Sequence, residues 1–389
     1  MTTSEDSSFY KAALRFLNKY FLEGQKLSES ERAKVNSVND QTPFMEKLLI
    51  EHRRLLGVAI PFVFFQTLYW LLAFRYSFFR FYSDKYIMAI VMVFGALIGG
   101  MTTEGGGAIA FPVMTIALNI SPIVARDFSL MIQSCGLTAA AFTIFFMSIT
   151  IEWHSIVFST IGAIFGIVFG LEVVDPLLSP AEKKMAFVSI FFSFALALYL
   201  LNSEKKRVTF DSIQNFTVIK ALTLIVNGFI GGIFTGVAGS GIDVYSFSIL
   251  TLLFRISEKV ATPTSVVLMS ANSMVGFFWR RFMDDAISQD AWEYLAVCLP
   301  VVVFFAPLGS FIASYFHRLT LAVLIYILET VALVGAIVVI RPALPLLCAS
   351  AALITLSFAF YYSIGRYVFQ LPVAFLLSSP PEFRVQMCR

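Results

Sequence analysis

Two glycine-rich segments with an adjacent carboxylate interrupt the apolar runs of this sequence, TEGGGAIAFP at 103–112 and AGSGIDV at 238–244. Glycine disfavours helix and lets the backbone approach a ligand closely. A short helix that begins just after such a break, at Ala108 or Ile242, directs free N–H groups and a positive dipole end toward the break, which favours anion binding. The residues expected to bind substrate at the breaks are Gly105, Gly106, Gly107 and Ala108 in the first, and Gly239, Ser240, Gly241 and Ile242 in the second.

Glu104 and Asp243 are the carboxylates beside the two breaks, and they conflict with anion binding. An ionised carboxylate about 4 Å from a bound anion repels it by roughly 4 kcal/mol at an effective dielectric near 20. A helix dipole supplies at best about 2 kcal/mol. One solution is that the carboxyl is protonated when the anion binds, which makes Glu104 and Asp243 candidates for proton coupling. The other is that each carboxylate faces an aqueous vestibule and caps backbone N–H groups.

Polar side chains in the two apolar runs that follow the breaks are suited to complete the hydrogen bonds of an oxyanion. The expected contributors are Gln133 and Ser134 in the first run, and Thr264, Ser265, Ser270 and Asn272 in the second. The alternative is that these groups bond to their own helix or join neighbouring helices. Arg126 and Asp127 open the first run. Because adjacent residues do not face each other on a helix, we expect no ion pair between them and place both at an aqueous mouth.

Composition indicates a membrane protein. Of the 389 residues, 58% are hydrophobic and 14% are charged, whereas a soluble domain is about half apolar and a quarter charged. The formal net charge of +3 is too small to indicate nucleic acid as a partner. Four cysteines and three histidines show no metal or redox spacing, so no cofactor is expected.

The predicted fold class is an all-α polytopic membrane protein with about ten full spans and two short half-helices next to the glycine breaks. The long spans are predicted at 55–73, 86–103, 123–147, 151–174, 183–202, 217–237, 259–279, 291–313, 319–340 and 344–363. The short pieces are 108–120 and 242–254. At 1.5 Å per residue each reaches about 20 Å, which is less than the roughly 30 Å hydrocarbon core.

An internal repeat organises these spans. Aligning Gly105 and Gly107 on Gly239 and Gly241 gives an offset of 134 residues, and the helices that follow correspond in the same order. Counting each short piece as a crossing gives five crossings per unit, and an odd number makes the two repeats inverted. The predicted organisation is a partly disordered cytosolic extension at 1–54, an extra span and loop at 55–85, transport repeat 1 at 86–202, a basic cytoplasmic linker at 203–216, transport repeat 2 at 217–340, and a C-terminal span and tail at 341–389.

Basic residues between the spans set the expected orientation. By the positive-inside rule, Lys205, Lys206 and Arg207 lie in the cytoplasm, whereas Asp284 and Asp285 suit the other side. The N-terminus is then cytoplasmic, and the cell membrane is the favoured location.

The glycine-rich break, the proline or small residue five positions later, and the Ala/Thr/Ser-rich helix that follows resemble the TauE/SafE family of sulfite exporters. The first copy matches through Gly105, Gly106, Gly107 and Pro112, and the second through Gly236, Gly239, Gly241, Ala261, Thr264 and Ser265. The second copy departs from the family at Ile242 and Ser246, where a glycine and a proline are common. The resemblance covers roughly 86–340 and implies permeation of small sulfur oxyanions or organosulfonates.

We therefore expect a secondary transporter of small sulfur-containing anions that binds its substrate between the two breaks and works by alternating access. Its partners are the anion, the lipid bilayer and a coupling proton. The alternative is a passive anion channel of the same architecture, because the same helix dipoles would serve it. An enzyme is not expected, since the sequence contains no HExxH or GxSxG motif.

Overall fold

The structure, a computed structural model, describes residues 14, 16–18, 20–22, 47, 50, 52–102, 105–203 and 209–378. Most of the predicted extension at 1–54, the three basic linker residues and Glu104 lie outside this set. The described helices are α4 (Arg53–Tyr76), α5 (Tyr82–Met101), α6 (Gly105–Pro112), α7 (Pro122–Phe146), α8 (Trp153–Phe169), α9 (Asp175–Leu177), α10 (Pro180–Ser203), α11 (Val218–Ala238), α12 (Ile242–Ser248), α13 (Glu258–Phe278), α14 (Gln289–Ala313), α15 (Arg318–Ile340) and α16 (Leu344–Ser378).

Short segments with different helical pitch join or extend these helices. They are the 3₁₀ turn η1 (Phe78–Phe81) and the π-helical turns η2 (Val113–Ala117), η3 (Gly170–Val174), η4 (Ile249–Leu253) and η5 (Trp279–Met283). Two of them complete the predicted short pieces, because η2 follows α6 and η4 follows α12.

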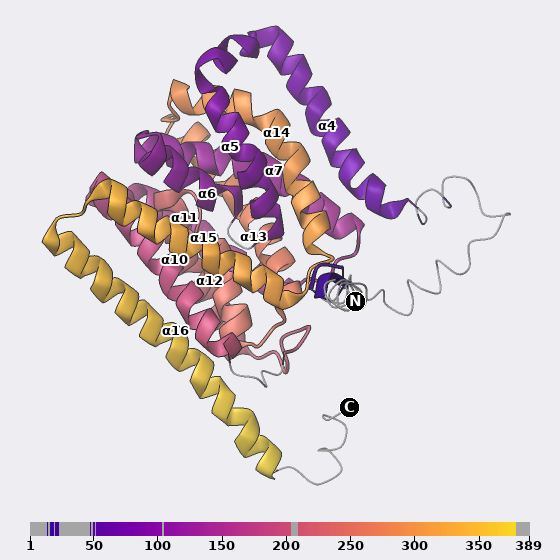
Figure 1. Ribbon diagram of the computed structural model, residues 1–389, viewed down its shortest axis with the longest axis vertical. Coiled ribbons are helices and arrows are strands. Elements are labelled where there is room, and N and C mark those ends of the chain that lie inside the picture. The colour runs from indigo at the N-terminus through magenta and orange to yellow at the C-terminus, as the bar shows by residue number, and fades with distance from the viewer. Residues whose placement is uncertain are drawn as a thin grey trace, which may run out of the picture.

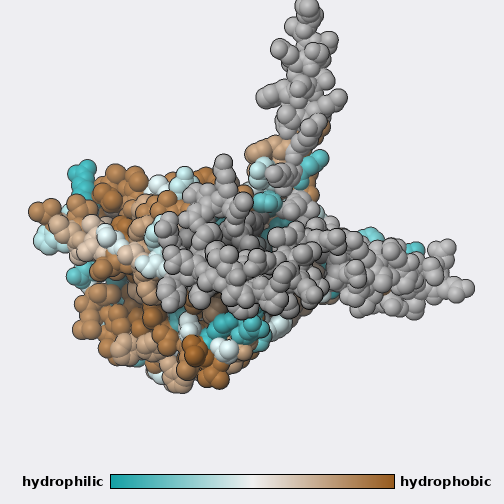
Figure 2. Space-filling model, turned by 90° about the horizontal axis from the view of Figure 1, so that it is seen from below, coloured by the Kyte–Doolittle hydropathy of each residue, from teal (hydrophilic) through white to brown (hydrophobic). Residues whose placement is uncertain are grey.

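The chain is an integral, multi-pass membrane protein. Within the described residues, nine helical stretches are long and apolar enough to cross a bilayer. They are formed by α4, η1 with α5, α7, α8 with η3 and α9, α10, α11, α14, α15 and the first part of α16. The tenth predicted span corresponds to α13, which is more polar and has most of its side chains buried inside the protein. Hydrophobic residues cover much of the surface visible in Figure 2.

A central group of helices is flanked on two sides. In Figure 1, α4 lies at one edge of the molecule and α16 at the opposite edge, with α5, α7, α13 and α14 between them. α4 packs on α14 and α7, where Gln66 Nε2 donates to Pro300 O at 2.7 Å. α10 packs on α15 and α16. The helices that carry both breaks and the predicted polar residues therefore lie in the centre.

The two halves of the central group pack in the same way. α5 packs along α14, and α11 packs along α8, in both cases where a glycine faces the backbone of the partner helix. A Cβ would collide with a carbonyl oxygen at each of these positions: Gly100 with Ala306 O, Gly232 with Ala163 O, Gly309 with Leu97 O and Gly166 with Phe229 O. The contact of Gly100 in one half corresponds to that of Gly232 in the other, and the contact of Gly309 corresponds to that of Gly166.

The short helices also end in the same local structure. The backbone bonds are Leu118 N to Val113 O (2.9 Å) and Ile120 N to Met114 O (2.8 Å) after α6, and Phe254 N to Ile249 O (3.0 Å) and Ile256 N to Leu250 O (2.8 Å) after α12. Each turn contains one non-glycine residue with positive φ, Asn119 at 53° and Arg255 at 55°. These bonds and dihedral angles repeat at an offset close to the one that aligns the two breaks.

α7 and α13 cross near the centre of the molecule and run in opposite directions there. Thr138 Oγ1 lies 3.0 Å from Ser270 Oγ. Leu130, earlier on α7, lies against Gly276, later on α13. The two helices that follow the breaks are therefore antiparallel neighbours.

The first break differs from the prediction in where its short helix begins. Gly105, Gly106 and Gly107 form the first turn of α6, so this helix begins at Gly105 and not at Ala108. Residues in a first helical turn have no intrahelical acceptor for their N–H groups, so poor helix formers are tolerated better there than in the interior. The chain direction changes earlier, at Thr102, whose N donates to Ile98 O at the end of α5. The start of α12 at Ile242 agrees with the prediction.

Candidate functional site

The second break is a tight turn capped by its own carboxylate. Gly239 closes α11 with a left-handed φ of 81°. Asp243 Oδ1 accepts from Gly241 N at 2.9 Å and from Val244 N at 3.0 Å, and Oδ2 accepts from Ser240 Oγ at 2.8 Å. Asp243 is completely buried. It therefore caps backbone N–H groups, as one alternative held, but it faces protein and not an aqueous vestibule.

Hydrogen bonds within the protein occupy the start of α12. In addition to the bonds to Asp243, Ile242 N donates to Thr235 Oγ1 at 3.0 Å. The prediction of free N–H groups is therefore wrong for Gly241, Ile242 and Val244. A carboxylate and a hydroxyl already satisfy the donors that the sequence analysis assigned to a bound anion.

α7 holds the second break in place. Gln133 Nε2 donates to Gly239 O at 2.7 Å and to Ser129 O at 3.0 Å. These two acceptors fix the orientation of the amide, so Gln133 Oε1 points away from them, is buried and has no hydrogen-bond partner. Gln133 lines a small cavity with about 190 Å³ of empty space, together with Met92, Ala96, Ile132, Leu137, Val302 and Ala306. One predicted site residue thus contacts the second break and a cavity.

The remaining predicted side chains lie on α7 and α13, and most bond to their own helix. The hydroxyl donors are Ser134 to Met131 O, Thr264 to Val260 O and Ser265 to Thr262 O. Between helices, Ser270 contacts Thr138, and Asn272 Nδ2 lies 3.3 Å from Thr160 Oγ1. The structure brings Ser270 and Asn272 to helix contacts, which agrees with the alternative that these groups join helices.

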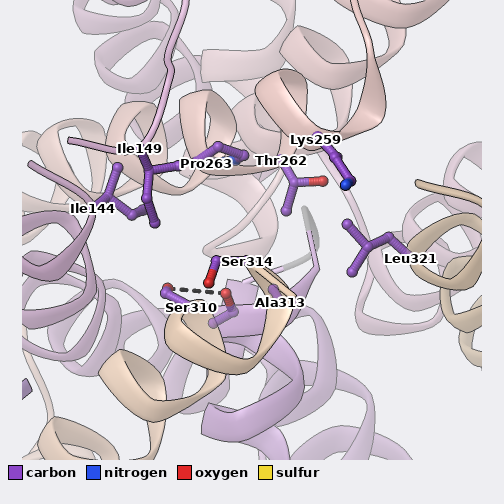
Figure 3. Close-up of a pocket in the computed structure, with 10 residues that line it drawn as sticks. Ile144, Ile149, Lys259, Thr262, Pro263, Ser310, Ala313, Ser314 and Leu321 are labelled. Atoms are coloured by element: carbon purple, nitrogen blue, oxygen red, sulfur yellow. Dashed lines mark hydrogen bonds between the residues drawn. The ribbon is translucent and has the colours of Figure 1, made fainter. Parts of the chain in front are cut away.

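A larger cavity lies beside the first break. None of the residues that line it was predicted to belong to a site. It has about 370 Å³ of empty space and is lined by Gly100, Ile144, Ile149, Lys259, Thr262, Pro263, Ser310, Ala313, Ser314 and Leu321. Figure 3 shows that side chains from the start of α13 and the end of α14 face this space from opposite sides. Lys259 is the first residue of the predicted span 259–279 and had no predicted role in the site. The available signal was its spacing from Thr262, because residues three apart share one helix face.

Arg126 and Asp127 belong to a buried group of ion pairs, so the prediction of a solvated, unpaired position is wrong. This ionic network consists of Arg126, Asp127, Asp175, Lys183, Arg280 and Asp284. Arg126 Nη2 lies 2.9 Å from Asp127 Oδ1, and both side chains are at most 2% exposed. The long arginine side chain reaches its neighbour even though their Cβ atoms point apart, and partners from other elements keep both residues inside.

The ionic network joins α7 to three other elements. Arg126 Nη1 is 2.7 Å from Asp175 Oδ2 in α9, and Lys183 Nζ in α10 is 2.6 Å from Asp175 Oδ1. Arg280 in η5 donates to both carboxylate oxygens of Asp127, at 3.1 and 3.0 Å. Three cations and three carboxylates are thus balanced at one end of the molecule, which we call the network end. The end that contains the larger cavity is the cavity end.

A family model described as sulfite exporter TauE/SafE matches residues 87–337. The match runs from α5 to α15, so it includes both breaks, the ionic network and both cavities, and it leaves out α4 and α16. No curated protein and no solved structure matches the chain.

Proposed function

Because the chain belongs to the sulfite exporter TauE/SafE family, we propose that it is a secondary transporter of small sulfur-containing anions of the sulfite or organosulfonate type. The family is one of membrane transporters, and the nine apolar helical stretches of the described residues suit that activity. The antiparallel crossing of α7 and α13, each of which follows a helix break, is the observation that carries the proposal furthest.

The first part of the proposal is that residues 86–202 and 217–340 are inverted repeats. Equivalent helices of such repeats are related by a two-fold axis in the membrane plane, so a pair of equivalent helices that meet at the axis must run antiparallel. α7 and α13 do so, and their contact between Thr138 and Ser270 joins nearly equivalent positions. The matching glycine contacts and π-helical turns support the same relation.

The second part is alternating access between the two ends of the molecule. Transporters with inverted repeats bind substrate at the repeat interface and open one end at a time. The network end is held by buried ion pairs that join α7 to α9 and η5, and α9 to α10. The cavity end contains the larger cavity. Ion pairs at one end and this cavity at the other support a conformation that is closed at the network end and accessible at the cavity end.

The substrate site is proposed to lie between the breaks. Gly105, Gly106, Gly107 and Ala108 supply the N-terminal turn of α6, and hydroxyl and amide groups of α7 and α13 supply further hydrogen bonds after side-chain rotation. Glu104 is the proposed proton-coupling residue. Asp243 is bonded to three donors and is better suited to hold the break than to exchange protons.

Uptake into proteoliposomes tests this function. The purified chain is reconstituted and supplied with sulfite, sulfate, sulfoacetate or taurine, with and without a proton gradient. We expect saturable uptake of at least one sulfur oxyanion or organosulfonate that increases with the gradient. Fast, non-saturating flux that ignores the gradient would establish the channel alternative. Uptake no greater than in protein-free liposomes for all four compounds would reject the function.

A further inference from the structure

The larger cavity combines one cation with several hydroxyls on otherwise apolar walls. Lys259 and Thr262 lie one turn apart on α13, and Ser310 lies in the last turn of α14, which Ser314 caps. Figure 3 shows the α13 residues above the empty space and the α14 residues below it. Ile144, Ile149 and Leu321 supply apolar lining. One ammonium and a few hydroxyls on apolar walls suit a compact charged ligand better than an extended or apolar one.

The Thr262 hydroxyl is the group that most directly indicates a ligand. Its side chain is 3% exposed, and its Oγ1 has no hydrogen-bond partner. Buried hydroxyls are nearly always bonded, so an unbonded one next to an empty volume indicates a place for a polar atom. The other hydroxyls have partners, because Ser310 Oγ donates to Gly100 O at 3.0 Å and Ser314 Oγ donates to Phe311 O at 2.6 Å.

The sign of the ligand follows from Lys259, the basic residue among those that line the cavity. Lys259 has an interaction with another group of the chain, and a bound anion would compete for or share the three donors of its ammonium. None of the lining residues carries a carboxylate. The favoured ligand is therefore a small anion that accepts from an ammonium and a hydroxyl.

The equivalent position in the other repeat is occupied by ion pairs. The offset that aligns the two breaks places Lys259 next to Arg126, which opens α7 as Lys259 opens α13. Arg126 is bonded to Asp127 and Asp175, and its backbone packs against Gly239 of the second break. The start of one equivalent helix is thus filled by ion pairs, whereas the start of the other borders a cavity.

We propose that this cavity is a second anion site, at which Lys259 and Thr262 hold a small sulfur oxyanion at the cavity end before or after it occupies the site between the breaks. The inference rests on the proposed function for the class of anion. Lys259 and Thr262 lie outside the glycine breaks, and their proposed role is to capture the anion at the cavity end.

Binding and transport by matched variants of the full chain test the proposal. Sulfate binding is measured by calorimetry on detergent-solubilised protein, and uptake is measured in proteoliposomes with whichever anion the wild type transports best. The variants are Lys259→Gln, which removes the charge, and Thr262→Val, which removes the hydroxyl at similar volume. The charge-preserving and hydroxyl-preserving partners are Lys259→Arg and Thr262→Ser. The control is Lys220→Gln, because Lys220 Nζ donates to the loop carbonyls of Gln214 and Asn215 and Lys220 is not among the residues that line the cavity.

We expect Lys259→Gln to weaken sulfate binding by about tenfold or more, as for loss of a charged hydrogen bond, and to raise the KM for uptake in parallel. Thr262→Val should weaken binding by a smaller factor, and Lys259→Arg and Thr262→Ser should recover most of the loss. Lys220→Gln should behave as wild type. Wild-type affinity and KM in both Lys259→Gln and Thr262→Val, in a wild type that transports, would overturn the second site and leave the proposed function intact. A wild type that transports none of the anions would overturn both.

Discussion

At the level of single residues, Asp243 occupies the place at the second break where the sequence predicted a bound anion. Its carboxylate accepts from two N–H groups and a hydroxyl at the second break, where a free helix N-terminus was expected. The glycine pattern predicted the break correctly, because Gly239 adopts the left-handed conformation and Ile242 begins a helix. Sequence spacing could not reveal whether a carboxylate next to the break turns inward, since this depends on how α7 closes over it.

Replacing Gly239 by alanine tests the strain at this turn. Its φ of 81° disfavours any other residue, and a Cβ would lie 2.6 Å from Ser129 Cβ and 2.8 Å from Arg126 O. We expect a loss of about 2–4 kcal/mol of stability, from the left-handed conformation and the collision together. Thermal unfolding in detergent measures it. The matched control is Gly335→Ala on α15, where nothing lies within 4 Å of the added Cβ. An equal melting temperature for the two variants would contradict the strain.

Glu104→Gln tests proton coupling at the first break. Glutamine resembles the protonated acid but cannot titrate, so we expect the variant to bind the anion and to lose the dependence of binding and uptake on pH. Sulfate affinity and uptake rate are measured across a pH series. Asp285→Asn serves as the control, because Asp285 is exposed and pairs with its neighbour Arg281. A Glu104→Gln profile that follows the wild type would remove Glu104 from the coupling.

At the level of elements, the sequence predicted the helices and missed the contacts between their polar residues. Among the described residues, ten long helices and two short ones appear close to the predicted ranges, because apolar length and glycine breaks are local signals. The exception is α16, which continues to Ser378 although its span was predicted to end at 363. The ionic network was not predictable, since Arg126, Asp175 and Arg280 are far apart in the sequence and meet only after α7, α9 and η5 have packed. The larger cavity was missed for the same reason, because five elements form its walls.

Two adjacent arginines allow a matched test of the ionic network. Arg280 is 12% exposed and pairs with the fully buried Asp127, whereas Arg281 is 45% exposed and pairs with the exposed Asp285. Breaking a buried pair costs about 3–5 kcal/mol, and an exposed pair contributes about 0–1 kcal/mol. We therefore expect Arg280→Gln to lower the melting temperature much more than Arg281→Gln. Similar melting temperatures would show that the network contributes little to stability.

At the level of the whole molecule, hydrogen bonds and ion pairs gather the loops at two ends. At the network end, Lys85 Nζ lies 2.9 Å from Asp290 Oδ1 and 3.1 Å from Glu293 Oε2. At the cavity end, Ile213 N donates to Glu152 Oε2 at 2.8 Å. This arrangement explains why Lys85 can lie at the end that the positive-inside rule assigns to acidic loops, since two carboxylates compensate its charge.

Cysteine labelling tests the predicted sidedness. In a background without the four native cysteines, a single cysteine is placed at Lys205 or at Asp285. Inverted repeats with the predicted orientation place residue 205 in the cytoplasm and residue 285 outside. A membrane-impermeant thiol reagent applied to intact cells should therefore label Asp285→Cys and spare Lys205→Cys until the membrane is opened. Labelling of both from one face would contradict the inverted arrangement.

The position of the ionic network at one end of the molecule has a thermodynamic consequence. If equivalent helices form the two ends, a chain with fully identical repeats would have two conformations of equal free energy, one open at each end, and would populate them equally. Ion pairs that break when one end opens lower the free energy of the conformation in which that end is closed. A population ratio of 99 to 1 requires about 2.7 kcal/mol, which is less than the roughly 3–5 kcal/mol lost on breaking one buried pair. One pair of the ionic network that breaks when its end opens would therefore be enough to set which side of the membrane the proposed transporter faces at rest.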